Sequence, residues 1–123
     1  SGTILSHFLV SLAEEANNTG KDSLSVDEFA VCLSQTGAKM NAAVSNPVEG
    51  TLLSVSRDAC QLMELAPFSN LKELIDAWYH KAYSELQKTP DQLVVDGVQI
   101  LKKAGVVDSG AQGFVYLIEG MSL

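Results

Sequence analysis

The sequence of this 123-residue chain predicts an all-α fold, an antiparallel helical bundle or barrel of about six helices. Apolar residues recur at helical spacing along nearly the whole chain, and most of these periodic segments begin at a recognisable cap. The segments between them are short, which favours antiparallel neighbours. With 46% apolar and 19% charged residues, the chain has the composition of one globular domain.

The first two helices are indicated by apolar stripes on either side of a turn segment, residues 17–23. Gly20 in that segment is a stop signal, and Ser25 with Glu28 forms an S-x-x-E capping box for the second helix. The stripe of the first helix comprises Ile4, Leu5, Phe8, Leu9 and Leu12, and that of the second comprises Phe29, Ala30, Leu33 and Met40.

Two proline-containing boxes and one asparagine predict the starts of the next three helices. The boxes Asn46-Pro47-Val48-Glu49 and Thr89-Pro90-Asp91-Gln92 each place proline at a first helical position, where its missing N–H costs nothing. Asn70 begins the helix between them. The helix that the second box opens is expected to run to Gly105, with Gly97 as a weak point inside it.

The glycine-rich stretch 105–113 ends one helix and begins the last, which Asp108 or Ser109 is expected to cap. Its glycines have two interpretations. A helix N-terminus with free N–H groups binds anions, and the chain start and the stretch 46–51 offer the same groups. Glycine also lets helices approach closely, and the spacing favours this packing role for the face made by Gly110, Ala111 and Gly113.

Charge and composition exclude several classes of function. The formal net charge is −7 and the eight basic residues are scattered, so we expect no surface for a nucleic-acid backbone. No apolar stretch approaches the roughly 20 residues that cross a bilayer, so no membrane span is predicted. The N-terminal stretch lacks the basic region of a signal peptide. We therefore expect a cytoplasmic location.

The residues alone predict no catalytic constellation and no metal site. Cys32 and Cys60 lie within apolar helical patterns without ligand spacing, so both are expected in the core. His7 and His80 belong to no ligand motif. The acidic residues fit helix caps and solvated helix faces better than an acid–base pair. On these grounds the chain is a helical bundle with a possible anion-binding rim.

Three segments together resemble a DhaL domain, the nucleotide-binding unit of dihydroxyacetone kinases. They read "SGTILSHFLVSLAE", "AVSNPVEGTLLSVSRDA" and "LKKAGVVDSGAQGFVYLIEGM", and they follow one another in the family's order. The branch they resemble most is that of fatty acid kinases. The resemblance implies an antiparallel eight-helix barrel that binds Mg-ATP at one rim. With about six helices, residues 1–123 look like the C-terminal portion of one such domain.

The resemblance also implies which residues lie at the nucleotide. The SG pair matches the helix start that contacts phosphate groups, the Thr-Leu pair lies near the nucleotide, and the Asp-Ser-Gly segment matches a nucleotide-contacting Asp-Pro-Gly loop. In this sequence these positions are Ser1, Gly2, Thr51, Leu52, Asp108, Ser109 and Gly110. Serine in place of proline at position 109 is usual for the fatty acid kinase branch. No catalytic residue and no metal ligand is implied among residues 1–123.

The family's magnesium ligands belong to an aspartate-rich GDxDTG loop that precedes the SG motif. Because this chain begins at that motif, we expect the ligands on a preceding part and the 123-residue chain alone to be inactive. The resemblance implies a parent kinase that phosphorylates a fatty acid carboxylate presented by a DegV-like binding protein. The alternatives are a dihydroxyacetone kinase-type subunit and a non-catalytic helical module for interaction or lipid holding. A flank left bare by absent helices would also favour self-association.

Overall fold

The computed structural model describes residues 2–65 and 67–122, and within these ranges the chain is an all-α bundle. This confirms the predicted fold class and the expected six helices. One short 3-10 helix lies between the third and the fourth of them. The elements are α1 (Gly2–Asn18), α2 (Val26–Ala43), α3 (Leu52–Gln61), η1 (Leu62–Leu65), α4 (Leu71–Gln92), α5 (Ile100–Ala104) and α6 (Ser109–Met121). None of the helices in these ranges is long and apolar enough to cross a membrane.

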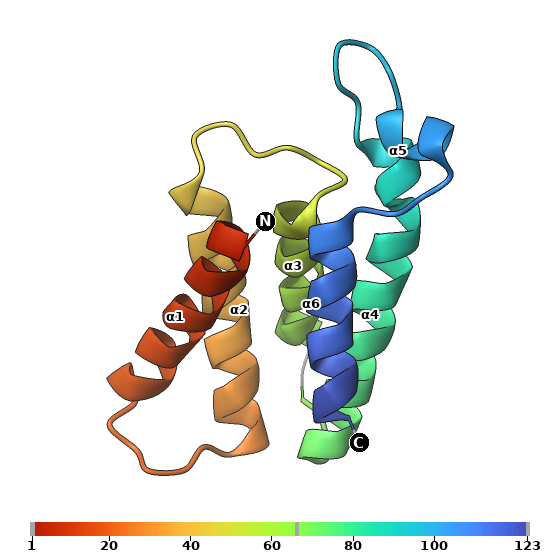
Figure 1. Ribbon diagram of the computed structural model, residues 1–123. Helices are drawn as coiled ribbons and strands as arrows, with labels where there is room; N and C mark the ends of the chain where they lie inside the picture. The colour runs from red at the N-terminus through yellow and green to blue at the C-terminus, as the bar shows by residue number, and fades with distance from the viewer. Residues whose placement is uncertain (1, 66, 123) are drawn as a thin grey trace.

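Successive long helices run in opposite directions, so the connections collect at two ends of the bundle (Figure 1). We call the end that carries residues 44–51, 93–99 and 105–108 the upper end, as it is drawn in Figure 1. The lower end carries residues 19–25 and the C-terminal turn of α6. Helix α3 lies centrally, in contact with α2, α4 and α6.

Three aromatic side chains from three helices form the centre of the core. Phe8 of α1, Trp78 of α4 and Phe114 of α6 are all fully buried. The Phe114 ring meets Phe8 edge-on at 5.1 Å between centroids and Trp78 at 5.8 Å, which is a favourable aromatic geometry. The first and last helices are therefore held to α4 by one aromatic cluster.

Several local predictions are confirmed. The Glu28 backbone N–H donates to the Ser25 hydroxyl and the Ser25 N–H donates to the Glu28 carboxylate, so the capping box is complete. The Asn70 side chain likewise accepts from the Glu73 N–H and caps α4. Gly105 ends α5 in the left-handed conformation, at φ 72°. The two cysteines, Cys32 and Cys60, are buried and unpaired with each other.

The predicted helix start at Asn46-Pro47 is wrong, because α3 begins only at Leu52. Gly50 adopts a left-handed φ of 78°, which interrupts any helix that started earlier. The N–H groups of Gly50 and Thr51 then donate to the Ser54 hydroxyl at 2.9 and 3.2 Å. A serine in the first turn of the helix thus holds the two residues before it, as the N3 side chain of a capping box does.

The predicted helix start at Thr89-Pro90 is also wrong, because α4 continues through Pro90 to Gln92. Proline lacks the N–H that would bond to the carbonyl of Leu86, four residues earlier. The Thr89 hydroxyl donates to that carbonyl at 2.8 Å instead. The helix ends two residues after Pro90, at Gln92.

Gly97 does not lie in a helix, contrary to the prediction. Asp96 and Gly97 both have positive φ, 51° and 77°, and form the tight turn of a small hairpin. Val95 and Val98 exchange two backbone hydrogen bonds of 2.9 and 3.0 Å across this turn. An Asp-Gly pair flanked by valines is a hairpin signal, and it outweighs the helical pattern around it.

The predicted packing role of the face made by Gly110, Ala111 and Gly113 holds for Ala111, which is fully buried in the core, but not for Gly113. Gly113 is exposed, and a Cβ atom added there would meet nothing within 4 Å. Close approaches occur at two other glycines. A Cβ atom on Gly37 would lie 2.6 Å from the Cβ of Cys60, and one on Gly50 would clash with the backbone of Leu93. The second contact brings the loop before α3 against the end of α4.

Candidate functional site

A pocket of about 300 Å³ opens at the upper end, where three segments distant in sequence converge. The first turn of α1, the segment from residue 44 to the start of α3, and the residue before α6 all contribute side chains. The lining consists of Ile4, Val44, Asn46, Val48, Thr51, Leu52, Leu53 and Asp108. Three helix N-termini therefore meet at one cavity.

The structure brings together three of the seven residues that the family resemblance implies at the nucleotide. Thr51, Leu52 and Asp108 line this pocket. Gly2 is exposed at the start of α1, and neither it nor Ser109 and Gly110 lines the pocket. Ser1 lies outside the described residues.

Most of the apolar lining was not predicted from the sequence. Val44, Val48 and Leu53 face the pocket alongside Ile4 of α1. Valines in a loop that also contains asparagine, proline and glycine were the available signal, since an irregular segment on the surface seldom needs apolar side chains. Their role depends on the position of the loop beside the first turn of α1.

The loop before α3 is held in place by its own hydrogen bonds. The Thr51 hydroxyl donates to the Val48 carbonyl at 2.7 Å, and the Ser54 hydroxyl donates to the Thr51 carbonyl at 3.1 Å. The Arg57 guanidinium donates to the Glu49 carboxylate at 2.8 Å and to Asp58 at 2.8 Å. Hydrogen bonds to Asp58 and Glu49 raise the pKa of Arg57 further, so this tether stays charged.

Asp108 is bonded through both its side chain and its backbone. Its carboxylate accepts from the Ala111 N–H at 3.0 Å, as an N-cap residue does, and the Gln112 N–H donates to its carbonyl at 2.9 Å. Its own N–H donates to the buried hydroxyl of Thr89 at 3.1 Å. The start of α6 is therefore already neutralised by a carboxylate of the same chain.

The charge of the pocket is unfavourable for a bare phosphate. No lysine or arginine is in its lining, and Asp108 contributes a negative charge. In the ranges 2–65 and 67–122, no group of three or more His, Cys, Asp or Glu side chains is arranged to hold a metal ion. These residues therefore do not provide a magnesium site by themselves. They provide an apolar wall with a few hydrogen-bonding groups.

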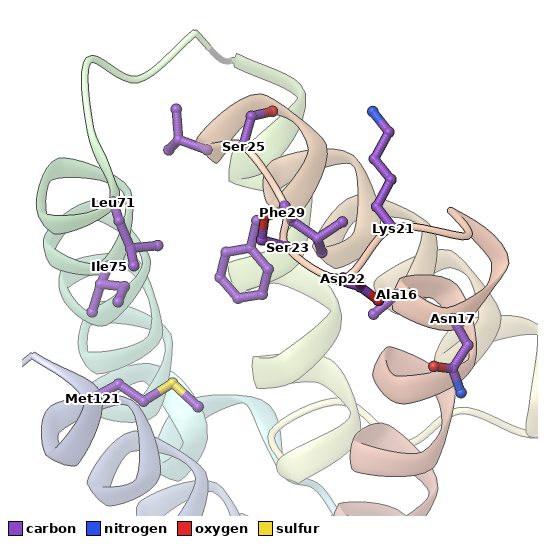
Figure 2. A pocket seen from close by; sticks show the side chains of 12 residues that line it. Ala16, Asn17, Lys21, Asp22, Ser23, Ser25, Phe29, Leu71, Ile75 and Met121 are labelled. Carbon is purple, nitrogen blue, oxygen red and sulfur yellow. The ribbon is translucent and has the colours of Figure 1, made fainter.

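A larger pocket, about 590 Å³, lies at the lower end (Figure 2). Phe29, Ile75 and Met121 point into it from α2, α4 and α6, whereas Lys21 points away at its margin. The full lining is Ala16, Asn17, Lys21, Asp22, Ser23, Leu24, Ser25, Val26, Phe29, Leu71, Ile75 and Met121. None of the described residues that the resemblance implies at the nucleotide belongs to this lining.

The cation at the margin of the lower pocket is already paired. The Lys21 ammonium bonds to the Glu28 carboxylate, the same group that completes the capping box. Hydrogen bonds from Lys21 and then from Ser25 lower the pKa of Glu28 to about 2. Lys21 is therefore neutralised within the chain, and the lower pocket is chiefly apolar.

Comparison with known proteins gives one family and a group of bacterial relatives. The family model described as the DAK2 domain matches residues 1–123. Protein YloV of Bacillus subtilis is 38% identical over 123 residues, covering 98% of this chain and 21% of the relative. An uncharacterized protein of Staphylococcus epidermidis is 35% identical, with 98% and 21% covered. An uncharacterized protein of Mycoplasma genitalium is 36% identical, with 98% and 22% covered.

The chain thus spans about a fifth of the length of the curated relatives that it matches. None of these three names states an activity. The match to the family covers the whole upper pocket, including Thr51, Leu52 and Asp108.

Proposed function

Because the chain belongs to the DAK2 domain family, a family of DhaL-type nucleotide-binding domains, we propose that it is part of an ATP-binding kinase domain. The observation that carries this proposal is the upper pocket. Residues from two of the three segments that resemble the family's nucleotide site, Thr51 with Leu52 and Asp108, line one cavity, and Ile4 of the third segment lies beside them.

The chemistry of the pocket suits the nucleoside part of ATP. Aliphatic side chains such as Val48 and Leu52 offer a surface for the base, and Asn46 and Thr51 offer hydrogen-bonding groups. A volume of about 300 Å³ is at the small end for ligand pockets and holds only part of a nucleotide. The Asp108 carboxylate disfavours an unshielded triphosphate at the same place. We place the base and ribose in the pocket and the phosphates at its mouth.

Magnesium would supply the charge neutralisation that phosphoryl transfer needs, and its ligands are not provided by the described residues. We propose that residues 1–123 form the C-terminal portion of a DhaL-type domain and that the ligands lie on the preceding portion. The contribution of this chain is then to bind and orient the nucleotide. The 123-residue chain alone is expected to be inactive, and ATP-dependent phosphorylation by the purified chain would contradict this.

For the whole protein we propose a cytoplasmic fatty acid kinase, with the acyl chain presented by a DegV-like binding protein. Support comes from the three segments that resemble this branch and from Ser109 in place of the proline of dihydroxyacetone kinases. A dihydroxyacetone kinase-type subunit is the alternative enzyme.

A thermal-shift experiment and a phosphorylation assay on the intact parent protein test these proposals. Mg-ATP is expected to raise the melting temperature, because a ligand that binds only the folded state stabilises it. The phosphorylation assay then offers an acyl-loaded DegV-like protein in one arm and dihydroxyacetone in the other. Phosphorylation in the first arm alone supports the fatty acid kinase, and phosphorylation in the second supports the alternative. No thermal response to Mg-ATP would contradict nucleotide binding altogether.

The lower pocket favours a second candidate function, a non-catalytic helical module for interaction or lipid holding. Its 590 Å³ and its apolar residues would accept part of an acyl chain. Leu71 and Met121 are 51% and 42% exposed there, so we also expect the isolated chain to self-associate. Binding of a fluorescent fatty acid probe to the chain, and its displacement by unlabelled fatty acid, would support lipid holding. The absence of probe binding would exclude it. A strictly monomeric chain in light scattering at high concentration would contradict self-association.

A further inference from the structure

We propose that Thr89 is a positioning residue of the upper pocket, which it sets by fixing Asp108 against the last turn of α4. This inference rests on the proposed nucleotide function. The hydrogen bonds of Thr89 that it uses are present without any nucleotide. Thr89 does not line the pocket, so its effect on the pocket is indirect.

The Thr89 hydroxyl makes two hydrogen bonds in a fully buried position. It donates to the Leu86 carbonyl at 2.8 Å and accepts from the Asp108 N–H at 3.1 Å. A hydroxyl has one proton, so the first bond orients its lone pairs for the second. Pro90 makes this arrangement possible, because it leaves the Leu86 carbonyl without a backbone N–H donor.

The same turn of α4 also supports the other loop of the pocket. Gly50 lies against the backbone of Leu93 so closely that a Cβ atom would be 2.9 Å from the Leu93 Cα. Thr51 and Leu52, which line the pocket, follow Gly50 directly. The turn from Thr89 to Leu93 is therefore the common support for both loops, and Thr89 is the side chain that links it to α6.

The loss of the hydroxyl predicts a specific disturbance at the start of α6. In Thr89→Val the shape is nearly kept, but Asp108 N–H faces a methyl group without an acceptor. Asp108 then shifts, and its carboxylate no longer holds the Ala111 N–H. Both the order of the first turn of α6 and the shape of the pocket wall depend on that carboxylate.

The chain offers a matched control in Thr36. Thr36 is also fully buried in a helix, and its hydroxyl donates to the Cys32 carbonyl at 2.7 Å, as Thr89 does to Leu86. Thr36 is absent from the lining of the upper pocket. Thr36→Val therefore removes a comparable buried hydroxyl without touching the proposed support. Thr89→Ser restores the hydroxyl and removes only a methyl group.

Amide hydrogen exchange on the 123-residue chain tests the proposal without nucleotide. In Thr89→Val, exchange at Ala111 relative to a core amide such as Trp78 is expected to rise about tenfold, and in Thr36→Val and Thr89→Ser it should stay within about twofold of wild type. Unchanged Ala111 protection in folded Thr89→Val would overturn the proposal. If Thr89→Val does not fold, Thr89→Ala gives the same comparison with a cavity in place of the misplaced methyl group.

A titration with ATP, followed by amide NMR, then separates the two proposals. We expect the dissociation constant to rise about tenfold in Thr89→Val and to remain within about twofold of wild type in Thr36→Val. Equal affinities in Thr89→Val and wild type would overturn the positioning role. If the wild-type chain binds no ATP in the presence or absence of Mg²⁺, the proposed function of this chain fails. The exchange result at Ala111 would still decide whether Thr89 positions Asp108.

Discussion

The helix starts at the two ends of the bundle are held by different kinds of contact. At the lower end, Ser25 and Asn70 cap their helices through side chains that bond three residues along the chain, and these bonds are exposed. At the upper end, Asp108 bonds to buried Thr89, which is 19 residues away, and Gly50 packs on the backbone of Leu93. The upper end therefore adds contacts between distant segments to its local caps, whereas the two caps named at the lower end are local.

Because of this difference, we expect a substitution at the upper end to disturb residues of other elements and a substitution at the lower end to disturb only its own helix. A helix cap at the lower end can be lost without moving its neighbours, because each cap is complete within its own helix. At the upper end the pocket wall depends on the last turn of α4, so a substitution in α4 alters two loops at once.

The largest effect is expected from Gly50→Ala. Its φ of 78° is unfavourable for alanine, and the added Cβ would clash with the backbone of Leu93, which cannot rotate away. We expect the free energy of unfolding in urea to fall by about 3 kcal/mol. Gly20→Ala is the matched control, since Gly20 has a φ of 68° but nothing within 4 Å. Its cost should be only about 1 kcal/mol, and equal losses in the two variants would contradict the close contact at Gly50.

An intermediate effect is expected from removing one cap at each end. Asp108→Ala and Ser25→Ala should each lower the free energy of unfolding by about 1 kcal/mol, the usual cost of a lost N-cap. Their reach should differ. Amide NMR signals of Thr51 and Leu52 are expected to shift in Asp108→Ala, because both residues share the pocket with Asp108, and to stay in place in Ser25→Ala. Shifts at Thr51 in both variants would show that the two ends are not independent.

The smallest effect is a pH dependence at the lower end. The folded-state pKa of Glu28 lies at about 2, below its ordinary value of 4.5, so its stabilising contribution is present above pH 4.5 and is lost as the pH falls toward 2. Glu28→Gln keeps a capping acceptor but cannot titrate. Melting temperatures measured between about pH 5 and pH 2.5 should therefore fall less steeply in Glu28→Gln than in wild type. Parallel curves would mean that Lys21 and Ser25 do not hold this carboxylate.

The same contrast explains which features could be predicted from the sequence. The fold class, the caps at Ser25 and Asn70 and the stop at Gly105 depend on residues a few positions apart, so local patterns suffice. The helix start assigned to Pro90 failed because Thr89 satisfies the carbonyl that Pro90 leaves open. The helix predicted across Gly97 failed because the Asp96-Gly97 pair forms a tight turn, which the helical spacing of the neighbouring apolar residues does not indicate.

In the candidate site, too, contacts between distant segments could not be predicted from local sequence patterns. Thr51, Leu52 and Asp108 were found through the resemblance, whereas the supporting contacts at Thr89 and Gly50 were not. Both contacts join segments that are distant in the chain, and neither leaves a pattern in the local sequence. Chemistry-bearing residues can thus be proposed from a sequence more readily than the residues that hold them in place.

The proposed function requires that the upper pocket binds the nucleotide. A titration of the 123-residue chain with ATP, followed residue by residue in two-dimensional amide NMR, tests it most directly. We predict shifts concentrated at Thr51, Leu52, Leu53 and Asp108 and absent from the lower pocket around Phe29 and Met121. Shifts centred on Phe29 and Met121 with none at Thr51 or Asp108 would contradict nucleotide binding at the upper pocket.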